Sequence, residues 1–437
     1  MTRVRFAPSP TGKLHIGNTR IALFNYLIAK KNNGDFILRL DDTDSERSTQ
    51  EFSDGLLKDL EWLGLNHDHT FKQSDRMDRY NEVLQQLKDM RRVYDCYETP
   101  EELSLKRKNQ IASGKPPVYD RASLKLSEQE KQEKQKKGIK PHWRFLLNEE
   151  SMSWNDLSRG ETKFEAEHLS DPVLVREDGR PLFTLTTVVD DMDEKITHIV
   201  RGDDHATNTA VQIQIFKALE SHIPEFGHLP LISGKDGDKM SKRLGNGTIS
   251  SLRENEIEPI TLLSALARLG TNFNADGNET MEQLINEFDM DNYSRSMPKF
   301  DVEELEKLNS KFINNMDFDI VKDRLPKQAS AEFWEIIKGN ISKLSQANLW
   351  LDVINKDIKT VIEEPDFIKT ALSLLPDGEI KKDSWKNWTS IIKAETGRTG
   401  KDLFMPLRLA ITGQKQGPEI GLLLPLIGRE KIIKRLS

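Results

Sequence analysis

Two stretches of this chain carry residues that could bind a phosphorylated substrate. The first is Val4 to Arg20, VRFAPSPTGKLHIGNTR, which runs from an apolar start through prolines and a glycine into His15 and a helical pattern. A strand that turns tightly into a helix leaves backbone N–H groups at one spot, where the helix dipole favours an anion. We expect His15 to donate to a phosphoryl oxygen and Gly17 to let a nucleotide approach the backbone. Taken alone, the stretch is equally consistent with an ordinary surface turn.

The second stretch is Ile232 to Gly247, ISGKDGDKMSKRLGNG, in which Lys239, Lys242 and Arg243 lie within five positions on a glycine-flanked loop. Such a loop can close over a triphosphate and neutralise charge as it develops on the leaving pyrophosphate. A basic loop by itself is more often simply solvated, so its meaning depends on the first stretch.

The elements around the first stretch predict a βαβ unit. An apolar strand from Arg3 to Ala7 is followed by a helix over Thr19 to Lys31, which Asn33-Gly34 should end, and then by a buried parallel strand over Phe36 to Leu40. The turn lacks the Gly-x-Gly-x-x-Gly pattern, so the Rossmann-like unit carries no implication of NAD. Asp41, directly after the second strand, could face a substrate cation, although a solvated turn that caps the next helix is the alternative.

The rest of the chain predicts an interrupted sheet followed by helices. Helical patterns cover Glu51 to Leu63 and Met77 to Met90, whereas Pro100 to Lys140 is an inserted, solvent-facing region with a basic helix. Strands are expected at His142 to Leu147, Asp171 to Glu177, Leu182 to Val189 and Ile196 to Val200, with a turn at Asp178 to Pro181 and a helix at Asn208 to Leu219. Helices should follow at Thr261 to Leu269, Met281 to Phe288, Val302 to Asn309 and Ala331 to Lys338.

Composition restricts the class of protein. The 437 residues are too many for one core, and 36% hydrophobic content with no apolar run long enough to cross a bilayer predicts a soluble, cytoplasmic protein without a signal peptide.

The single Cys96 excludes an internal disulfide and a multi-cysteine zinc site. His67 and His69 are better explained by a polar loop than by a metal pair. The net charge of −7 argues only weakly against nucleic acid, because a local basic face can dominate binding.

The two stretches together resemble a known signature pair. RFAPSPTGKLHIG, followed about 225 residues later by KMSKR, is similar to the HIGH and KMSKS motifs of the class I aminoacyl-tRNA synthetases, and the RFAPSPTG lead-in resembles their glutamyl branch of bacterial type. Further similar segments, in the same order, are RLDDTDSERS, EWLGL, TPEEL, VVDD, ITHIVRGDDHATNT, HLPLISGKDGDKMSKR and FMPLRLAITG. The resemblance therefore covers nearly the whole chain.

The resemblance implies ATP-dependent activation of glutamate to glutamyl-adenylate and transfer to the 3′ end of a tRNA, with Mg²⁺ accompanying the ATP. It implies that His15, Lys239 and Lys242 are catalytic. The implied ATP-binding residues are Pro8, His15, Gly17, Asn18, Met240, Ser241 and Lys242, and the implied glutamate-binding residues are Arg5, Ala7, Ser9, Asp41, Phe183, Thr187 and Arg201. The motif regions themselves comprise Pro8, Ser9, Pro10, Thr11, Gly12, Lys13, Leu14, His15, Ile16, Gly17 and Asn18, and then Lys239, Met240, Ser241, Lys242 and Arg243.

The sequence departs from the family pattern at several positions. Asn18 replaces the second histidine of the first motif, as often in the glutamyl branch, and Asp41 stands where many relatives have glutamate. Phe183 and Thr187 occupy positions where relatives often carry tyrosine and asparagine. Cys96 lies where some relatives have a cysteine pair for zinc, and because one cysteine cannot build that site we predict no zinc and no other protein-held metal.

The resemblance implies an α/β fold with three parts. We expect a Rossmann-like catalytic domain at 1–250 with an acceptor-end-binding subdomain inserted at 77–180, a helical stem-contact region at 251–305, and a helical anticodon-binding region at 306–437. The cognate stays open between tRNA-Glu and tRNA-Gln, and we expect a monomer. A non-catalytic tRNA-binding paralogue is the alternative from another class; a relative that modifies a tRNA base and a small-molecule adenylyltransferase do not account for the helical C-terminal region.

Overall fold

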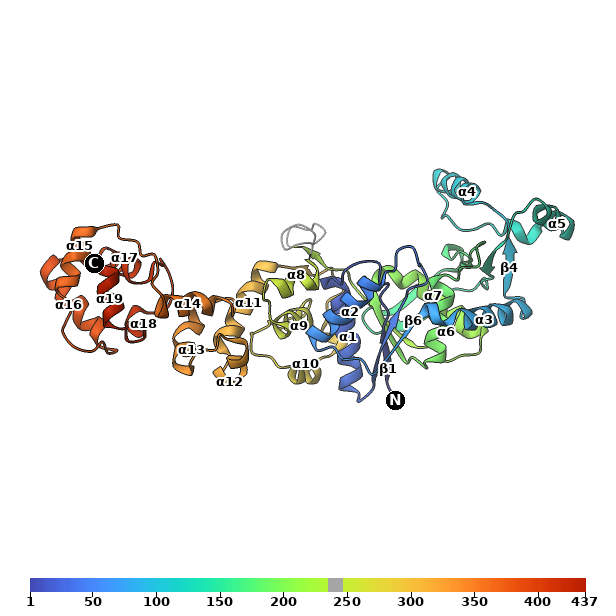
Figure 1. Cartoon of the computed structure of the whole chain (residues 1–437). Coiled ribbons are helices and arrows are strands. Elements are labelled where there is room, and N and C mark those ends of the chain that lie inside the picture. The colour runs from blue at the N-terminus through green and yellow to red at the C-terminus, as the bar shows by residue number, and fades with distance from the viewer. Residues whose placement is uncertain (235–246) are drawn as a thin grey trace. The chain divides into compact units, whose positions relative to one another are not determined.

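The computed structural model describes residues 1–234 and 247–437 (Figure 1). The chain forms two compact units. The first comprises Met1–Asn255, Leu262–Ala275 and Glu279–Asp301, and the second comprises Glu256–Thr261, Asp276–Asn278 and Val302–Ser437. Within the described residues, no helix is both long and apolar enough to cross a membrane.

The first unit is built on a parallel sheet. Its described strands are β1 (Arg3–Phe6), β2 (Asp35–Leu40), β3 (His69–Lys72), β9 (His198–Gly202) and β10 (Glu225–Leu229), in the order β10-β9-β1-β2-β3. All pairings between these described strands are parallel. The predicted βαβ unit is confirmed, because α1 (Ile16–Lys31) connects β1 to β2. The predicted stop is also confirmed: Asn33 has a left-handed φ of 51°, and the Gly34 N–H donates to the Ala29 carbonyl at 2.8 Å.

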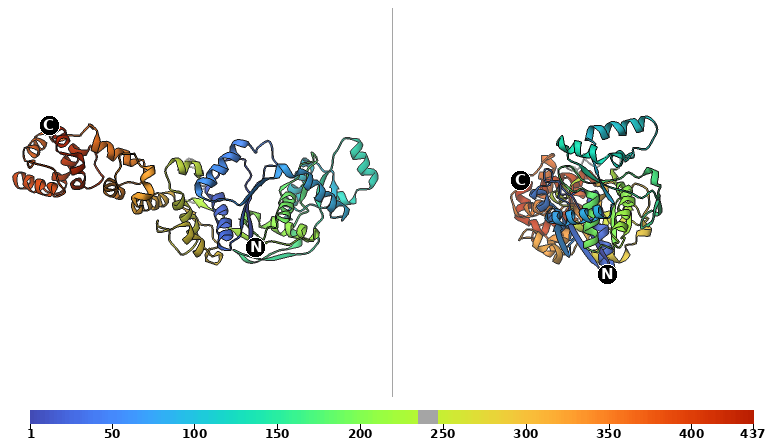
Figure 2. Two further views of the ribbon diagram at one scale, coloured as in Figure 1. Left: turned by 60° about the horizontal axis from the view of Figure 1, so that its bottom comes forward. Right: turned by 90° about the vertical axis from the view of Figure 1, so that its right-hand side faces the viewer.

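Helices pack on both sides of this sheet in the views of Figures 1 and 2. Besides α1 and two helices of the inserted region, the helices of the first unit are α2 (Gln50–Leu63), α3 (Met77–Asp89), α6 (Phe183–Asp193), α7 (Ala206–Ala218), α8 (Ile249–Glu254), α9 (Pro259–Arg268, whose first residues belong to the second unit) and α10 (Met281–Glu287). The first unit also contains a short parallel pair of strands, β11 (Ser233–Gly234) and β12 (Lys299–Phe300). His69 begins β3, so the expected polar loop at His67 and His69 is only partly correct.

One prediction of secondary structure was wrong. The stretch from Leu182 to Val189, expected as a strand, is the start of α6. Residues 185–191 are all buried, and α6 packs against α3, α7 and β8 (Val173–Val175). A short apolar run that is buried on every side has no polar face to reveal a helical period, so the sequence pattern does not distinguish it from a buried strand.

The inserted region has its own small sheet. The strands β4 (Val93–Cys96), β5 (His142–Phe145) and β8 pair antiparallel, β6 (Met152–Asp156) and β7 (Gly160–Phe164) form a hairpin, and α4 (Pro100–Ala112) and α5 (Glu128–Lys136) have no buried residues. Both helices begin with a capping box, formed by Thr99 with Glu102 and by Ser127 with Glu130. Figure 2 shows α4 and α5, in cyan, standing out from the first unit, as the prediction of a solvent-facing insertion requires.

The second unit is helical. Its helices are α11 (Val302–Asn315), α12 (Phe318–Val321), α13 (Ala331–Ile337), α14 (Gln346–Asn355), α15 (Pro365–Ser373), α16 (Ser384–Thr396), α17 (Gly400–Thr412), α18 (Ile420–Ile427) and α19 (Arg429–Leu436). Their apolar faces share one hydrophobic core. Two buried tryptophans satisfy their polar atoms there, since Trp334 donates to the Met316 carbonyl and Trp388 to the Ala371 carbonyl, each at 2.9 Å.

We predict that Gly34→Ala destabilises the first unit. A Cβ at Gly34 would lie 2.2 Å from the Thr2 carbonyl oxygen at the edge of the β1–β2 pair, so the backbone must shift. The expected loss is about 1–3 kcal/mol in the free energy of unfolding, measured by urea denaturation. Gly55→Ala in α2 is the matched control: its Cβ meets nothing within 4 Å, and the change should stabilise the helix by about 0.5–1 kcal/mol. Equal effects of the two substitutions would contradict the close approach at Gly34.

Candidate active site

A cavity of about 520 Å³ lies at the carboxyl ends of the parallel strands. Open parallel sheets place ligand-binding residues at this edge. The segments after β1 and β2, the start of α1, one residue of α6 and the segment after β9 all contribute to it. The predicted site residues that line the cavity are Arg5, Ala7, Pro8, Ser9, Thr11, His15, Gly17, Asn18, Asp41, Phe183 and Arg201. The other residues of the first motif, Pro10, Gly12, Lys13, Leu14 and Ile16, shape the turn without lining the cavity.

His15 forms the N-cap of α1 with its side chain. Its Nδ1 accepts hydrogen bonds from the backbone N–H groups of Gly17 at 3.1 Å and Asn18 at 3.4 Å. We expected the backbone N–H groups at the start of this helix to be available for an anion. Those of Gly17 and Asn18 are instead bonded to the His15 side chain. Because Nδ1 is an acceptor, the neutral ring carries its proton on Nε2, which is left as the donor. Partial desolvation lowers the pKa of His15, which favours this neutral form.

Gly17 is needed for that arrangement. A Cβ at Gly17 would lie 3.0 Å from Cε1 and 3.1 Å from Nδ1 of His15. The glycine thus keeps room for the imidazole over the first turn of α1, in addition to the expected access for a ligand. The turn is also fixed to the second strand, since the Asp41 N–H donates to the Pro8 carbonyl at 3.0 Å.

Beneath the cavity lies a network of buried charges. Arg5 donates through Nε to Asp191 at 3.0 Å and through Nη2 to the other oxygen of the same carboxylate at 3.4 Å. Arg39 contacts Asp41 through Nε at 2.6 Å and Nη2 at 3.2 Å, and Asp191 through Nη1 at 2.9 Å. Arg5, Arg39, Asp41 and Asp191 are all less than 9% exposed. Their mutual pairing offsets the cost of removing each charge from water.

Asp190 anchors the same network from below. It accepts from Tyr80 at 2.9 Å, from Gln73 at 2.7 Å and from Nε of Arg76 at 2.8 Å. Burial raises the pKa of Asp190, an effect that Arg39 and these hydrogen bonds oppose. Burial likewise raises the pKa of Asp41 to about 6, although Arg39 pulls in the opposite direction.

Arg201 differs from the other two arginines because no carboxylate pairs with it within the described part of the chain. It is 6% exposed, and its Nη2 donates to Thr209 at 2.6 Å and to Gln212 at 2.7 Å. Its Nε and Nη1 are buried and have no hydrogen-bond partner among the described residues. Burial, together with the nearby charge of Arg5, lowers the pKa of Arg201 to about 9. A buried cation with free donors in the wall of a cavity is suited to an anionic ligand.

Phe183 and Thr187, two of the positions that depart from the family pattern, lie in different surroundings. Phe183 lines the cavity, and its ring centroid is 5.2 Å from that of His205. Thr187 is 1% exposed and does not line the cavity; its hydroxyl accepts from Arg39 at 3.2 Å. Thr187 therefore contacts the buried charges and not the cavity itself.

The second basic stretch, Lys239, Met240, Ser241, Lys242 and Arg243, lies outside the described residues. The residues on its two sides belong to the first unit: Ser233–Gly234 forms β11, and Thr248 forms an isolated antiparallel bridge with His15. The Ile249 N–H also donates to the Leu14 carbonyl at 2.9 Å. The chain therefore returns to the first motif directly after the basic stretch.

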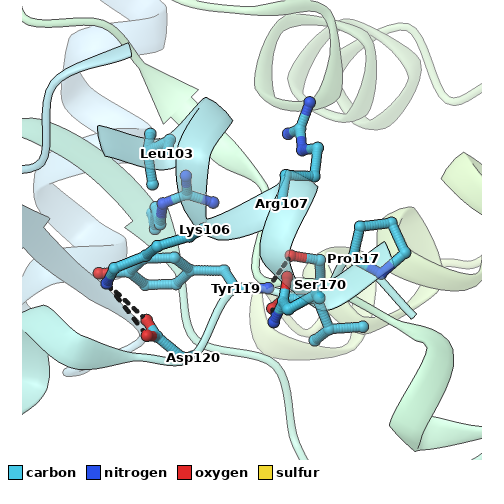
Figure 3. A pocket seen from close by; sticks show the side chains of 10 residues that line it. Leu103, Lys106, Arg107, Pro117, Tyr119, Asp120 and Ser170 are labelled. Carbon is cyan, nitrogen blue, oxygen red and sulfur yellow. Dashed lines mark hydrogen bonds and ion pairs between the residues drawn. The ribbon is translucent and has the colours of Figure 1, made fainter. Parts of the chain in front are cut away.

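A smaller pocket lies in the inserted region (Figure 3). Figure 3 shows Lys106 reaching Asp120, and Tyr119 whose backbone N–H donates to the Ser170 hydroxyl at 2.9 Å. Nearby, Glu98 accepts from the hydroxyls of Tyr119 and Ser123, each at 2.7 Å. Burial raises the pKa of the neighbouring Cys96 thiol to about 11. The polar side chains near Cys96 are therefore held by hydrogen bonds to one another. Among the described residues, no group of three potential metal ligands occurs.

Several residues of the site were not found by the sequence analysis. Arg39, Thr209, Gln212 and His205 each contribute to the cavity or contact a residue that lines it. Asp191 was noted only as part of the VVDD segment. His205 and Asp191 lie in polar segments directly after apolar runs, whereas Arg39 and Gln212 lie within apolar runs. The pairing between β2 and α6, which are far apart in sequence, leaves no local pattern.

Comparisons with known proteins agree with this geometry. Residues 1–307 match the family model described as the catalytic domain of class I tRNA synthetases (E and Q), and residues 351–437 match an anticodon binding domain. The chain belongs to this family of class I tRNA synthetases.

Full-length relatives narrow the comparison to glutamate–tRNA ligases. The chain is 49% identical to glutamate–tRNA ligase 1 of Maricaulis maris, with 100% of this chain and 99% of that protein covered, and 48% identical to the protein of that name from Rickettsia felis, with both covered completely. The crystal structure of a glutamate tRNA ligase from Elizabethkingia meningosepticum in complex with its amino acid is similar over 100% of this chain and 98% of that chain, with a TM-score of 0.85 and 26% identity. The glutamate-tRNA synthetase of Elizabethkingia anophelis has the same coverage and identity and a TM-score of 0.84.

We predict that Asp191→Ala destabilises the first unit by about 3–5 kcal/mol, because it leaves the buried guanidinium groups of Arg5 and Arg39 without their shared partner. Urea denaturation followed by circular dichroism measures the change. Asp54→Ala, at an exposed position of α2, should cost less than about 1 kcal/mol. A loss at Asp191 as small as that at Asp54 would show that the buried pairs do not stabilise the fold.

Proposed function

We propose that the protein is a glutamate–tRNA ligase that forms glutamyl-adenylate from glutamate and ATP and transfers the glutamyl group to tRNA. The observation that carries the proposal is one cavity lined both by the His15 turn and by Arg5, Asp41 and Arg201. The first part suits the phosphates of a nucleotide, and the second suits an amino acid with two carboxylates and one ammonium. The full-length similarity to glutamate–tRNA ligases supports the same reaction.

The first half-reaction uses the turn at the start of α1. A carboxylate oxygen of glutamate attacks the α-phosphorus of ATP, the bond to the bridging oxygen breaks, and pyrophosphate leaves with Mg²⁺. The Nε2–H of His15, fixed by the capping contacts of Nδ1, donates to a phosphoryl oxygen. Lys242, assisted by Lys239, stabilises the negative charge on the transferring phosphoryl group. Pro8, Gly17, Asn18, Met240 and Ser241 complete the nucleotide site.

Glutamate is held by the charged wall of the cavity. Arg201, through its unpaired Nε and Nη1, and Arg5 bind the carboxylates, and Asp41 binds the ammonium. Asp191 uses the Nε and Nη2 edge of Arg5, which leaves Nη1 for the substrate. Ala7, Ser9 and Phe183 form the uncharged part of the wall, whereas Thr187 acts through Arg39.

The second half-reaction requires a tRNA. A hydroxyl of the terminal ribose attacks the carbonyl of the adenylate, and AMP leaves. We assign acceptor-end binding to the insertion at 77–180, stem contact to 251–305 and anticodon binding to 306–437; the family match at 351–437 supports the last of these. We propose that the enzyme is a cytoplasmic monomer whose cognate is tRNA-Glu, with tRNA-Gln as the alternative that the experiment below decides.

The proposed function is tested by ATP–pyrophosphate exchange with glutamate in the presence of tRNA. Exchange that depends on tRNA-Glu is expected. Exchange with tRNA-Gln alone would identify the other cognate, and exchange with both would identify a ligase that does not discriminate. No exchange with either tRNA would refute the ligase assignment and leave a non-catalytic tRNA-binding protein. Replacing glutamate with glutamine or aspartate is the specificity control.

We predict that the KM for glutamate rises as the pH falls through about 6. Asp41, whose pKa is raised to about 6, must be ionised to bind an ammonium group, and protonation removes that charge. Between pH 7 and pH 5 the ionised fraction falls about tenfold, and the KM should rise by up to about that factor. Steady-state aminoacylation across this range measures the change.

Asp41→Asn is the control for that titration. It should raise the KM at pH 7 and remove most of the dependence between pH 7 and pH 5, because the amide does not titrate. A variant with the same pH dependence as the unsubstituted enzyme would assign the titration to another group.

A further inference from the structure

The buried Arg201 guanidinium is held by only one of its nitrogens. Both protons of Nη2 are used, by Thr209 at 2.6 Å and by Gln212 at 2.7 Å, and both acceptors lie on α7. Nε and Nη1 have no hydrogen-bond partner in residues 1–234 and 247–437. The orientation of the two free donors toward a ligand therefore depends on how firmly Thr209 and Gln212 are themselves held.

Thr209 is held by a second buried group. Its Oγ1 is 2.8 Å from Nε2 of His228 on β10, and Nδ1 of His228 is 2.5 Å from a carboxylate oxygen of Asp156. Thr209 and His228 are 0% exposed and Asp156 is 2% exposed. A continuous row of hydrogen bonds thus runs from the cavity wall to the turn of the β6–β7 hairpin.

Asp156 is a fixed end for this row. Its Oδ1 accepts from the backbone N–H groups of His228 and Arg159 at 3.1 Å and of Ser158 at 3.0 Å, and its Oδ2 accepts from the indole N–H of Trp154 at 3.1 Å. Although burial opposes it, the hydrogen bonds from His228 and Trp154 lower the pKa of Asp156 to about 2. The carboxylate is therefore ionised and fully coordinated.

The direction of the hydrogen bonds follows from that end. Nδ1 of His228 donates to the Asp156 carboxylate, and burial lowers the pKa of His228, so the ring is neutral and its Nε2 is an acceptor. The Thr209 hydroxyl then donates to Nε2, which leaves its oxygen lone pairs for the N–H of Arg201. The donor and the acceptor of each hydrogen bond in the row are therefore fixed, and each hydrogen bond strengthens the neighbouring one by polarisation.

We propose that Thr209, His228 and Asp156 are positioning residues that orient Arg201 for a carboxylate of the amino-acid substrate. The proposal rests on the function assigned to Arg201 above. None of the three lines the cavity, so they act through Arg201 and not by contact with the ligand. The carboxylate in this proposal is the side-chain carboxylate of glutamate, which does not react. Because it is bound equally in the ground and transition states, loss of this support should raise the KM for glutamate and leave kcat nearly unchanged.

The decisive variant is Thr209→Val, which keeps the shape of the side chain and removes the hydroxyl. Loss of a hydrogen bond to a charged group should raise the KM for glutamate about tenfold, with kcat and the KM for ATP changed by less than about twofold. Thr209→Ser retains a hydroxyl and should restore the KM to within about twofold of its original value. Thr261→Val is the matched control, because Thr261 is also buried but its hydroxyl has no hydrogen-bond partner in the part of the chain that the structure describes.

The outcomes separate this proposal from the one on which it rests. A folded Thr209→Val enzyme with an unchanged KM for glutamate would overturn the positioning role, as would a loss of kcat and of affinity for both substrates that Thr209→Ser does not restore. If Thr209→Val fails to fold, Thr209→Ala, which cannot overpack the site, is held to the same criteria. Arg201→Lys tests the underlying function separately: an unchanged KM for glutamate in that variant would remove Arg201 from the glutamate site.

Discussion

The site depends on the need to pair the Arg39 guanidinium, which is 1% exposed near the carboxyl end of β2. A charge in that position is tolerated only with carboxylates close by. One comes from Asp41 on the same strand segment, and another comes from Asp191 on α6, which at the same time holds Arg5 of β1. Three elements that are distant in sequence are thus held in one arrangement by a single electrostatic requirement. Removing Asp41 or Asp191 would leave a buried guanidinium group with one carboxylate partner fewer.

The same arrangement explains why the cavity carries both signs of charge. Arg39 and Arg5 are paired from within the protein, whereas Arg201 on the neighbouring strand has hydrogen bonds but no carboxylate. Arg201 thus lies in the wall of the cavity without a carboxylate partner among the described residues. The parallel order of β9, β1 and β2 brings Arg201, Arg5 and Asp41 to the same edge of the sheet, so the strand topology itself assembles the charged wall.

The sequence predicted the parts of the site that are recorded in local patterns. The strand, turn and helix around His15 and the βαβ unit are correct, because turn residues and apolar spacing specify them within about thirty positions. The helix α6 was mistaken for a strand because residues 185–191 are all buried, so no exposed face reveals the helical period. The capping of α1 by His15 and the sharing of Asp191 between Arg5 and Arg39 could not be predicted, since they depend on rotamers and on contacts between residues up to 186 positions apart. The resemblance implies that Arg201 binds glutamate, but only the structure reveals which of its donors are occupied.

The β6–β7 hairpin lies in a region that looks, from sequence, like an addition to the sheet. Its turn nevertheless contributes Asp156 to a buried contact with His228 of β10, and the Leu157 N–H donates to the Phe226 carbonyl at 2.8 Å. The insertion is consequently not a detachable module. A deletion or exchange of this hairpin with one from another protein would leave an unpaired imidazole inside the sheet domain. Substitutions at the hairpin turn are therefore constrained by the interior of the catalytic domain. If the insertion is transferred to another protein, Asp156 and His228 must be transferred as a pair.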